Sequence, residues 1–198
     1  MTRPSIFFAA LGLLMFLAGS GRGVAADAAA GKAVAAGCAG CHGEDGVSQT
    51  PDTPSLAAQP DEFIQWQLVY FRSGSRKNEV MQPIAQALSN EDIRNLGAYY
   101  ASLPPPKPGA SGAADALAHE GQRTAAQYRC KTCHADKFEG KKVTARLAGQ
   151  REDVLLKALR DFKSGARVGV GVATMADVVY GLNDHDMQAL ARYMAALP

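Results

Sequence analysis

Apolar residues recur at helical spacing in four segments of this chain, and no segment shows the alternation of a half-buried strand. The four segments are residues 61–71, 89–103, 152–162 and 183–197. Ser89-Asn90-Glu91-Asp92 and Asn183-Asp184-His185-Asp186 each combine an N-cap side chain with an acidic first turn. Apolar residues at this spacing form a stripe that one face of a helix buries. The pattern therefore predicts an all-α protein.

The helical segments belong to two copies of one unit. Leu56-Ala57-Ala58-Gln59 matches Leu147-Ala148-Gly149-Gln150, and the alignment continues to the end of the chain with one three-residue insertion in the second copy. Among the matched residues are Leu68, Phe71, Ser73, Gly74 and Arg76 with Leu159, Phe162, Ser164, Gly165 and Arg167. A proline run followed by glycine and serine, residues 104–112, lies between the copies and is typical of an extended linker. We therefore expect a first domain at residues 27–104, a linker at 105–114 and a second domain at 115–198.

The first residues of the chain have the features of a secretory signal. Arg3 precedes an apolar run of 13 residues, 6–18, and small residues end at Ala26. The run is shorter than the ~20 apolar residues that span a bilayer. Residues 1–26 are therefore predicted to be a cleaved signal peptide, and the mature protein is expected in the periplasm, free or resting on a membrane complex.

All the cysteines of the chain lie in a doubled motif. Cys38-Ala39-Gly40-Cys41-His42 recurs 92 positions later as Cys130-Lys131-Thr132-Cys133-His134. This motif is the attachment signature of c-type haem, in which both thiols bond to the haem and the histidine ligates the iron. A zinc site usually places its Cys-x-x-Cys pairs about 12–20 residues apart, whereas 89 positions separate Cys41 from Cys130. Structural disulfides would leave the paired histidines unexplained, so we predict two covalent haem c groups.

The sixth iron ligand is predicted to be a methionine in each domain. Met81 lies 39 residues after His42, and Met175 lies 41 residues after His134. The two methionines occupy equivalent positions of the repeat, whereas Met187 and Met194 align with Ile93 and Tyr100 and are expected to pack on the last helix. Methionine opposite histidine raises the reduction potential of haem iron. With both axial positions filled, no small-molecule substrate is expected at the iron.

Further residues of both copies are candidates for contacts around the haems. A ligating histidine usually donates its other ring N–H to a carbonyl or carboxylate, and the carbonyl of Pro54 is the candidate in the first domain; Ala145 stands at the equivalent place in the second. Arg76 and Arg167 are candidates to pair with haem propionates, with a solvated helix end as the alternative. His119 and His185 have no histidine counterpart in the first copy and are expected at the surface.

Charge is distributed unevenly along the mature chain. Residues 27–104 hold five Lys/Arg and nine Asp/Glu, a formal charge of −4, whereas residues 109–198 hold 13 and 10, a formal charge of +3. No concentrated basic face is present, which argues against a nucleic-acid partner. The asymmetry is either solvated surface or a means of orienting partner proteins of opposite sign.

Taken together, these motifs resemble those of the two-domain, dihaem class I cytochromes c, above all the cytochrome c4 type. The resemblance covers residues 27–198 and includes both haem motifs, the Leu-Ala-x-Gln and Phe-x-Ser-Gly-x-Arg segments and the methionines before the last helices. It implies two all-helical domains, two His/Met-ligated haems near their interface, periplasmic residence and one-electron transfer without enzymatic activity of the chain's own. The second domain departs from the pattern, because it lacks the proline before its Leu-Ala segment and has a loop at 168–173 rich in glycine and valine.

The predicted function is electron transfer between periplasmic or membrane-bound redox proteins. A dehydrogenase or a quinol-oxidising complex is the expected donor, and a terminal oxidase or reductase is the expected acceptor. One alternative is a dihaem subunit of a periplasmic dehydrogenase complex. Another is a haem peroxidase or sulfur-compound oxidase, which requires that one methionine leave its iron open.

Overall fold

The structure, a computed structural model, describes residues 25–108, 115–167 and 172–198. The predicted signal peptide lies outside the described residues except for its last two positions. So do residues 109–114 of the predicted linker and most of the glycine- and valine-rich loop at 168–173.

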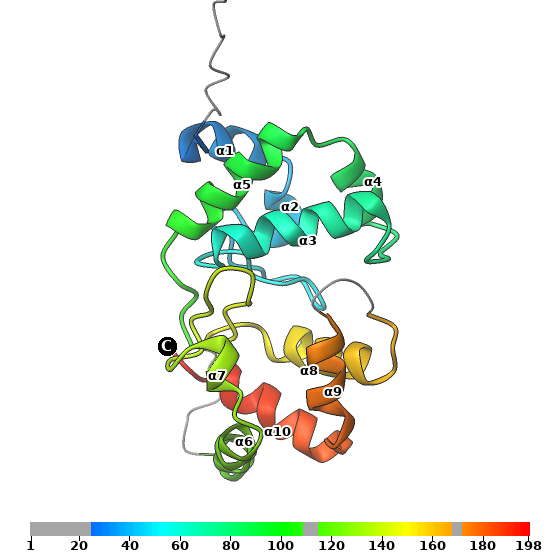
Figure 1. The fold of residues 1–198 in the computed structure, drawn as a ribbon. Coiled ribbons are helices and arrows are strands. Elements are labelled where there is room, and N and C mark those ends of the chain that lie inside the picture. The colour runs from blue at the N-terminus through cyan, green and yellow to red at the C-terminus, as the bar shows by residue number, and fades with distance from the viewer. Residues whose placement is uncertain (1–24, 109–114, 168–171) are drawn as a thin grey trace, which may run out of the picture.

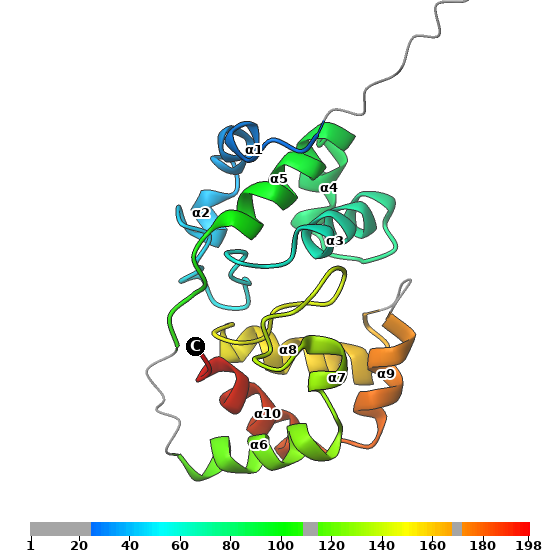
Figure 2. The same cartoon turned by 60° about the vertical axis from the view of Figure 1, so that its left-hand side comes forward.

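Two helical lobes follow one another along the chain and lie against each other (Figures 1 and 2). The first lobe contains α1 Ala28–Ala35, α2 Ala39–His42, α3 Asp61–Ser73, α4 Met81–Gln86 and α5 Asn90–Ser102. The second contains α6 Ala116–Gln127, α7 Lys131–His134, α8 Glu152–Lys163, α9 Val172–Tyr180 and α10 Asp184–Ala195. The described residues form no strand, and one isolated bridge joins Lys141 to Thr144. The predicted all-α fold of two repeated units is confirmed.

The last helix of each lobe begins at the cap that the sequence predicts. Ser89 Oγ accepts a hydrogen bond from the Asp92 N–H at 3.0 Å, and the Asp92 carboxylate accepts one from the Ser89 N–H at 2.9 Å. Asn183 and Asp186 form the same reciprocal pair at the start of α10. These capping boxes satisfy backbone donors that a helix N-terminus leaves unpaired. They therefore fix where α5 and α10 begin.

In each lobe the first helix crosses the last one at a glycine. A Cβ atom built on Gly31 in α1 would lie 2.0 Å from the carbonyl oxygen of Asn95 in α5. A Cβ on Gly121 in α6 would lie 2.0 Å from the carbonyl oxygen of Ala189 in α10. No side-chain carbon fits at such a distance, so the two crossings depend on the missing Cβ.

The apolar cores differ in size between the lobes. Around α8, α9 and α10 the large buried residues are Phe138, Leu155, Val179, Leu182, Met187, Leu190 and Met194. The buried cluster of the first lobe is smaller, comprising Ala35, Ile64, Leu96, Tyr99 and Tyr100. Met187 and Met194 pack on α10 as expected. Domains of this size bury little apolar surface on their own, which leaves a role in each core for a bound group.

The lobes are joined by a symmetric pair of glutamines. The Gln59 side chain donates to the carbonyl of Arg146 at 2.9 Å and accepts from the N–H of Arg146 at 3.0 Å. The Gln150 side chain makes the same two bonds with Ser55, at 2.8 and 2.9 Å. Because Gln59 aligns with Gln150 and Ser55 with Arg146, one repeat recognises the other as in a two-fold dimer.

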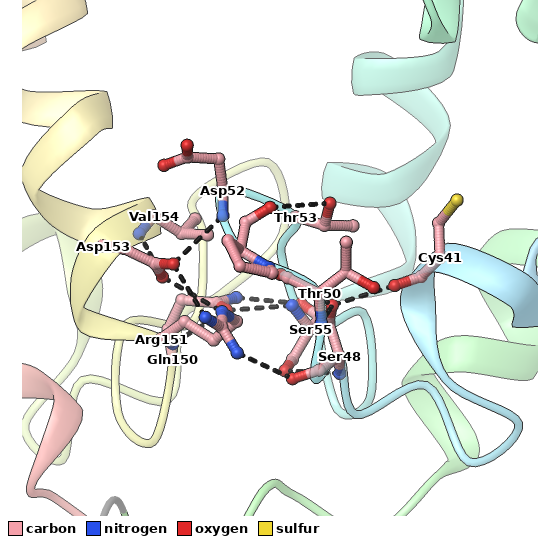
Figure 3. A network of polar contacts seen from close by, with 11 residues as sticks. Cys41, Ser48, Thr50, Asp52, Thr53, Ser55, Gln150, Arg151, Asp153 and Val154 are labelled. Carbon is pink, nitrogen blue, oxygen red and sulfur yellow. Dashed lines mark hydrogen bonds and ion pairs between the residues drawn. The ribbon is translucent and has the colours of Figure 1, made fainter.

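A second set of contacts joins the lobes without a symmetric counterpart (Figure 3). Arg151 donates to the carbonyl of Ser48 at 3.3 Å, and the Ser48 hydroxyl donates to the carbonyl of Cys41 at 2.9 Å. Asp153 accepts from the N–H of Asp52 at 3.0 Å. The loop that follows the first haem motif is therefore fastened to the start of α8.

Among the described residues, no helix has the length and the apolar character needed to cross a membrane.

Candidate haem-binding sites

Each Cys-x-x-Cys-His motif forms a single helical turn. In α2, Cys41 is exposed and Cys38 is partly buried, and in α7 Cys133 and Cys130 show the same difference. All four cysteines are free, and no three His, Cys, Asp or Glu side chains of the described residues gather into a metal site. The arrangement would allow one group to attach to each pair of thiols, and Cys41 and Cys133 are the exposed members of the two pairs.

The two motif histidines are buried and held in the same way. His42 Nδ1 lies 2.8 Å from the carbonyl oxygen of Pro54, and His134 Nδ1 lies 2.9 Å from that of Ala145. A carbonyl only accepts, so Nδ1 carries the proton and the Nε2 lone pair is free to ligate iron. Burial lowers the pKa of both imidazoles and so favours the neutral form. Loss of the proline in the second lobe leaves this hydrogen bond in place.

The two candidate methionines lie in α4 and α9, two helices that were not predicted from the sequence. Met81 is the first residue of α4, where the side chain of Asn78 accepts from its N–H at 2.8 Å. Met175 lies within α9 and packs against the core of the second lobe. Both side chains are partly buried. They remain candidates for the sixth ligand because they occupy equivalent positions of the repeat and because both side chains are partly buried.

Arg76 and Arg167, aligned in the repeat, meet at the boundary between the lobes. Arg76 donates to Gln67 Oε1 at 2.6 Å, and Arg167 donates to the same oxygen at 2.9 Å. The Arg76 guanidinium also lies 4.5 Å from the ring centroid of Phe71, and that of Arg167 lies 4.5 Å from the centroid of Phe162. Burial lowers the pKa of Arg76 to about 9 and that of Arg167 to about 10, and for Arg76 the charge of Arg167 adds to the effect.

The chemistry of this cluster suits the carboxylates that two haems would bring. Arg167 Nε is buried and has no hydrogen-bond partner among the described residues. A buried guanidinium without an anion is costly, because the side chain stays charged at neutral pH. Haem propionates are carboxylates, which match the fork of an arginine side chain. The cysteine, histidine and methionine donor set is likewise that of a c-type haem.

The two remaining histidines lie at the surface, as expected. His119 is exposed in α6, and His185 pairs with Glu120 at 2.7 Å on an exposed face. The contact of His185 joins α10 to α6.

The sequence segments that contain the two motifs carry opposite charges. Residues 38–55 contain Glu44, Asp45 and Asp52, all exposed, and no Lys or Arg. Residues 130–146 contain five Lys/Arg and two Asp/Glu. Four of the five are the exposed lysines Lys131, Lys137, Lys141 and Lys142. The charge asymmetry of the chain is thus concentrated beside Cys41 and Cys133.

Sequence reasoning missed the residues that connect the two sites. Gln59 and Gln150 belong to the Leu-Ala-x-Gln repeat, so their equivalence was visible although their partners were not. Gln67 aligns with Ala158 and Arg151 aligns with Pro60, so neither is marked by the repeat. Only the structure brings these side chains to the boundary.

Comparisons with known proteins agree with this geometry. A family model for cytochrome c matches residues 28–104 and again residues 118–198. Cytochrome c4 from Azotobacter vinelandii is 32% identical over 189 residues, covering 87% of this chain and 90% of that protein. A thiosulfate dehydrogenase electron acceptor from Thiomonas intermedia is 33% identical over 156 residues, covering 73% of this chain and 70% of that protein. The crystal structure of reduced cytochrome c4 from Pseudomonas stutzeri has a TM-score of 0.78 at 30% identity, covering 88% of this chain and all of that one.

Proposed function

This chain belongs to the cytochrome c family as a dihaem protein of the cytochrome c4 type, and from that premise we propose how its residues serve electron transfer and which partners they select. Its function is to carry single electrons between redox proteins, and it is not an enzyme. Two haem c groups, bound through Cys38, Cys41, Cys130 and Cys133, supply the one-electron chemistry. What the chain adds is ligation, exclusion of water and the charge around each site.

We propose that His42 and Met81 ligate one iron and that His134 and Met175 ligate the other. The main support for this ligand set is that both motif histidines are buried and donate Nδ1–H to a backbone carbonyl, at 2.8 and 2.9 Å. This geometry fixes the ring orientation and directs Nε2 toward the ligated side. With a methionine as the second ligand, neither iron would have an open position for substrate.

The test of this closed arrangement is an anaerobic redox titration followed by exposure of the reduced protein to carbon monoxide. Two reversible one-electron steps and an unchanged ferrous spectrum under carbon monoxide are expected. A spectrum that shifts for one haem would identify an open iron, and the peroxidase or sulfur-compound oxidase alternative would replace the carrier.

We further propose that the protein works in the periplasm and exchanges electrons with two classes of partner. A thiosulfate dehydrogenase electron acceptor among its relatives supports a dehydrogenase as donor. A quinol-oxidising complex is the other donor that the one-electron chemistry suits, and a terminal oxidase or reductase is the matching acceptor. The acidic surroundings of Cys41 favour a partner with a basic face, and the lysines around Cys133 favour one with an acidic face.

The proposal that the lysines around Cys133 attract a negatively charged partner is tested with a small anionic oxidant. In the double variant Lys141→Glu/Lys142→Glu, oxidation of the reduced protein by ferricyanide is expected to slow at least about threefold at 0.01 M ionic strength, because steering by local charge is lost. The difference should nearly vanish at 1 M, where the Debye length falls from about 30 to about 3 Å. Stopped-flow absorption gives the rates.

The matched control is Lys32→Glu/Lys77→Glu, which changes the net charge equally at exposed positions of the first lobe. If this control slows the reaction as much, total charge and not the lysine patch governs the rate.

A further inference from the structure

A single glutamine is shared by two arginines at the boundary between the lobes. Gln67 Oε1 accepts from Arg76 at 2.6 Å within its own lobe and from Arg167 at 2.9 Å across the boundary. A carbonyl oxygen has two lone pairs, so both acceptor positions are used. Each guanidinium is also fixed from behind by its own phenylalanine, Phe71 or Phe162, with 4.5 Å between guanidinium carbon and ring centroid.

The two arginines occupy equivalent positions of the repeat, whereas the glutamine has no glutamine at the equivalent position of the second lobe. Arg76 aligns with Arg167 and Phe71 with Phe162, whereas the partner of Gln67 in the repeat is Ala158, which has no polar side chain. Two independent arginine sites would each contain an acceptor of their own. Here one amide from the first lobe orients both guanidiniums, so the second site is completed by a residue of the first.

Among the described residues, no carboxylate forms an ion pair with either arginine. Two cations share one neutral acceptor, and Arg167 Nε has no partner among the described residues. Asp161, the acid whose charge acts on both arginines, already pairs with Lys157 at 2.5 Å. Holding two guanidiniums together against their repulsion is useful only if anions bind to them. The propionates of the two haems meet that need.

We propose that Gln67 is a positioning residue for electron transfer, which holds Arg76 and Arg167 side by side so that each guanidinium presents its remaining N–H groups to a haem propionate. One side chain of the first lobe thereby adjusts the reduction potentials of both haems. This proposal rests on the assignment of the two arginines as propionate partners. The arginines compensate propionate charge, and weaker compensation makes each iron harder to reduce.

The test is Gln67→Glu in the matured dihaem protein, with both reduction potentials measured by spectroelectrochemical titration. The carboxylate keeps the shape of the amide but competes with the propionates for both arginines. The equilibrium constant for reduction is expected to fall about three- to tenfold at both haems, a tenfold fall being 59 mV for one electron. Gln67→Asn, which is shorter and neutral, is expected to lower both constants about twofold through loss of positioning.

Gln65→Glu is the matched control. Gln65 lies two residues away on α3, binds Asp61 at 2.7 Å, and its Cγ faces Gly97 of α5, away from the arginines. This variant adds the same charge to the same helix, and the reduction constants are expected to change by less than about twofold. A response equal to that of Gln67→Glu would overturn the proposal, since charge alone would explain it.

Two arginine variants distinguish the proposed role of Gln67 from the assignment of Arg76 and Arg167 as propionate partners. Arg76→Gln and Arg167→Gln are expected to lower the reduction constant mainly of the haem in their own lobe. If both respond while Gln67→Glu moves only one haem or neither, Gln67 has no shared role and the arginine assignment stands. If neither arginine variant moves a potential, the propionate assignment itself fails. A joint shift of both haems in both Gln67 variants, with small effects in the control, supports the proposal.

Discussion

Replacing Gly31 by alanine is expected to destabilise the first lobe by more than about 3 kcal/mol. The added Cβ would lie 2.0 Å from the carbonyl oxygen of Asn95 and 2.8 Å from Cβ of Tyr99. Backbone atoms cannot move aside as the end of a flexible side chain can, so α1 must shift away from α5. For a domain of this size the melting temperature should fall by at least about 12 °C. Thermal unfolding of the mature dihaem protein, followed by circular dichroism, gives the change.

Gly121→Ala is expected to do the same to the second lobe, because its Cβ would meet the carbonyl oxygen of Ala189 at 2.0 Å. Gly37→Ala is the control: its Cβ would lie 3.6 Å from the carbonyl oxygen of Val34, an ordinary contact. Its melting temperature should stay within a few degrees of the unchanged protein. Normal stability in Gly31→Ala would show that α1 and α5 do not approach as closely as described.

These two crossings illustrate which parts of the fold the sequence could predict. The start of α5 was predictable because Ser89 and Asp92 form their capping box within four residues. The helix crossing at Gly31 was not, because it depends on a residue 64 positions away, Asn95, whose contact carries no local signal. The short helix α4, six residues long, gives too few turns for an apolar period to appear.

At the haem sites, too, the residues with a local sequence motif could be predicted and those placed by contacts between distant segments could not. The cysteines and histidines follow from one pentapeptide each, since the attachment chemistry fixes their spacing within a helical turn. The hydrogen bond from His42 to the carbonyl of Pro54 could be expected because only 12 positions separate the two residues, and Nδ1 lies 2.8 Å from the carbonyl oxygen. The meeting of Arg76 with Arg167 required the relative placement of the lobes, which no repeat can specify. No motif and no repeat position in the sequence indicated a role for Gln67.

Met81 and Met175 are expected to supply the second ligand of each iron. We expect the ferric mature protein to show a far-red sulfur-to-iron absorption band worth two methionine ligands. Met81→Ala and Met175→Ala should each remove half of it. The equilibrium constant for reduction of the affected haem should fall on the order of a hundredfold, about 120 mV for one electron, because the thioether favours the ferrous state. Absorption spectra and a redox titration of each variant give both quantities.

Met187→Leu is the matched control, because Met187 is buried in the core at 4% exposure and its replacement keeps the volume. Its band and potentials should equal those of the unchanged protein. A band that survives Met81→Ala would assign the sixth position of that iron to another residue. A band worth a single ligand in the unchanged protein would mean that one haem is open.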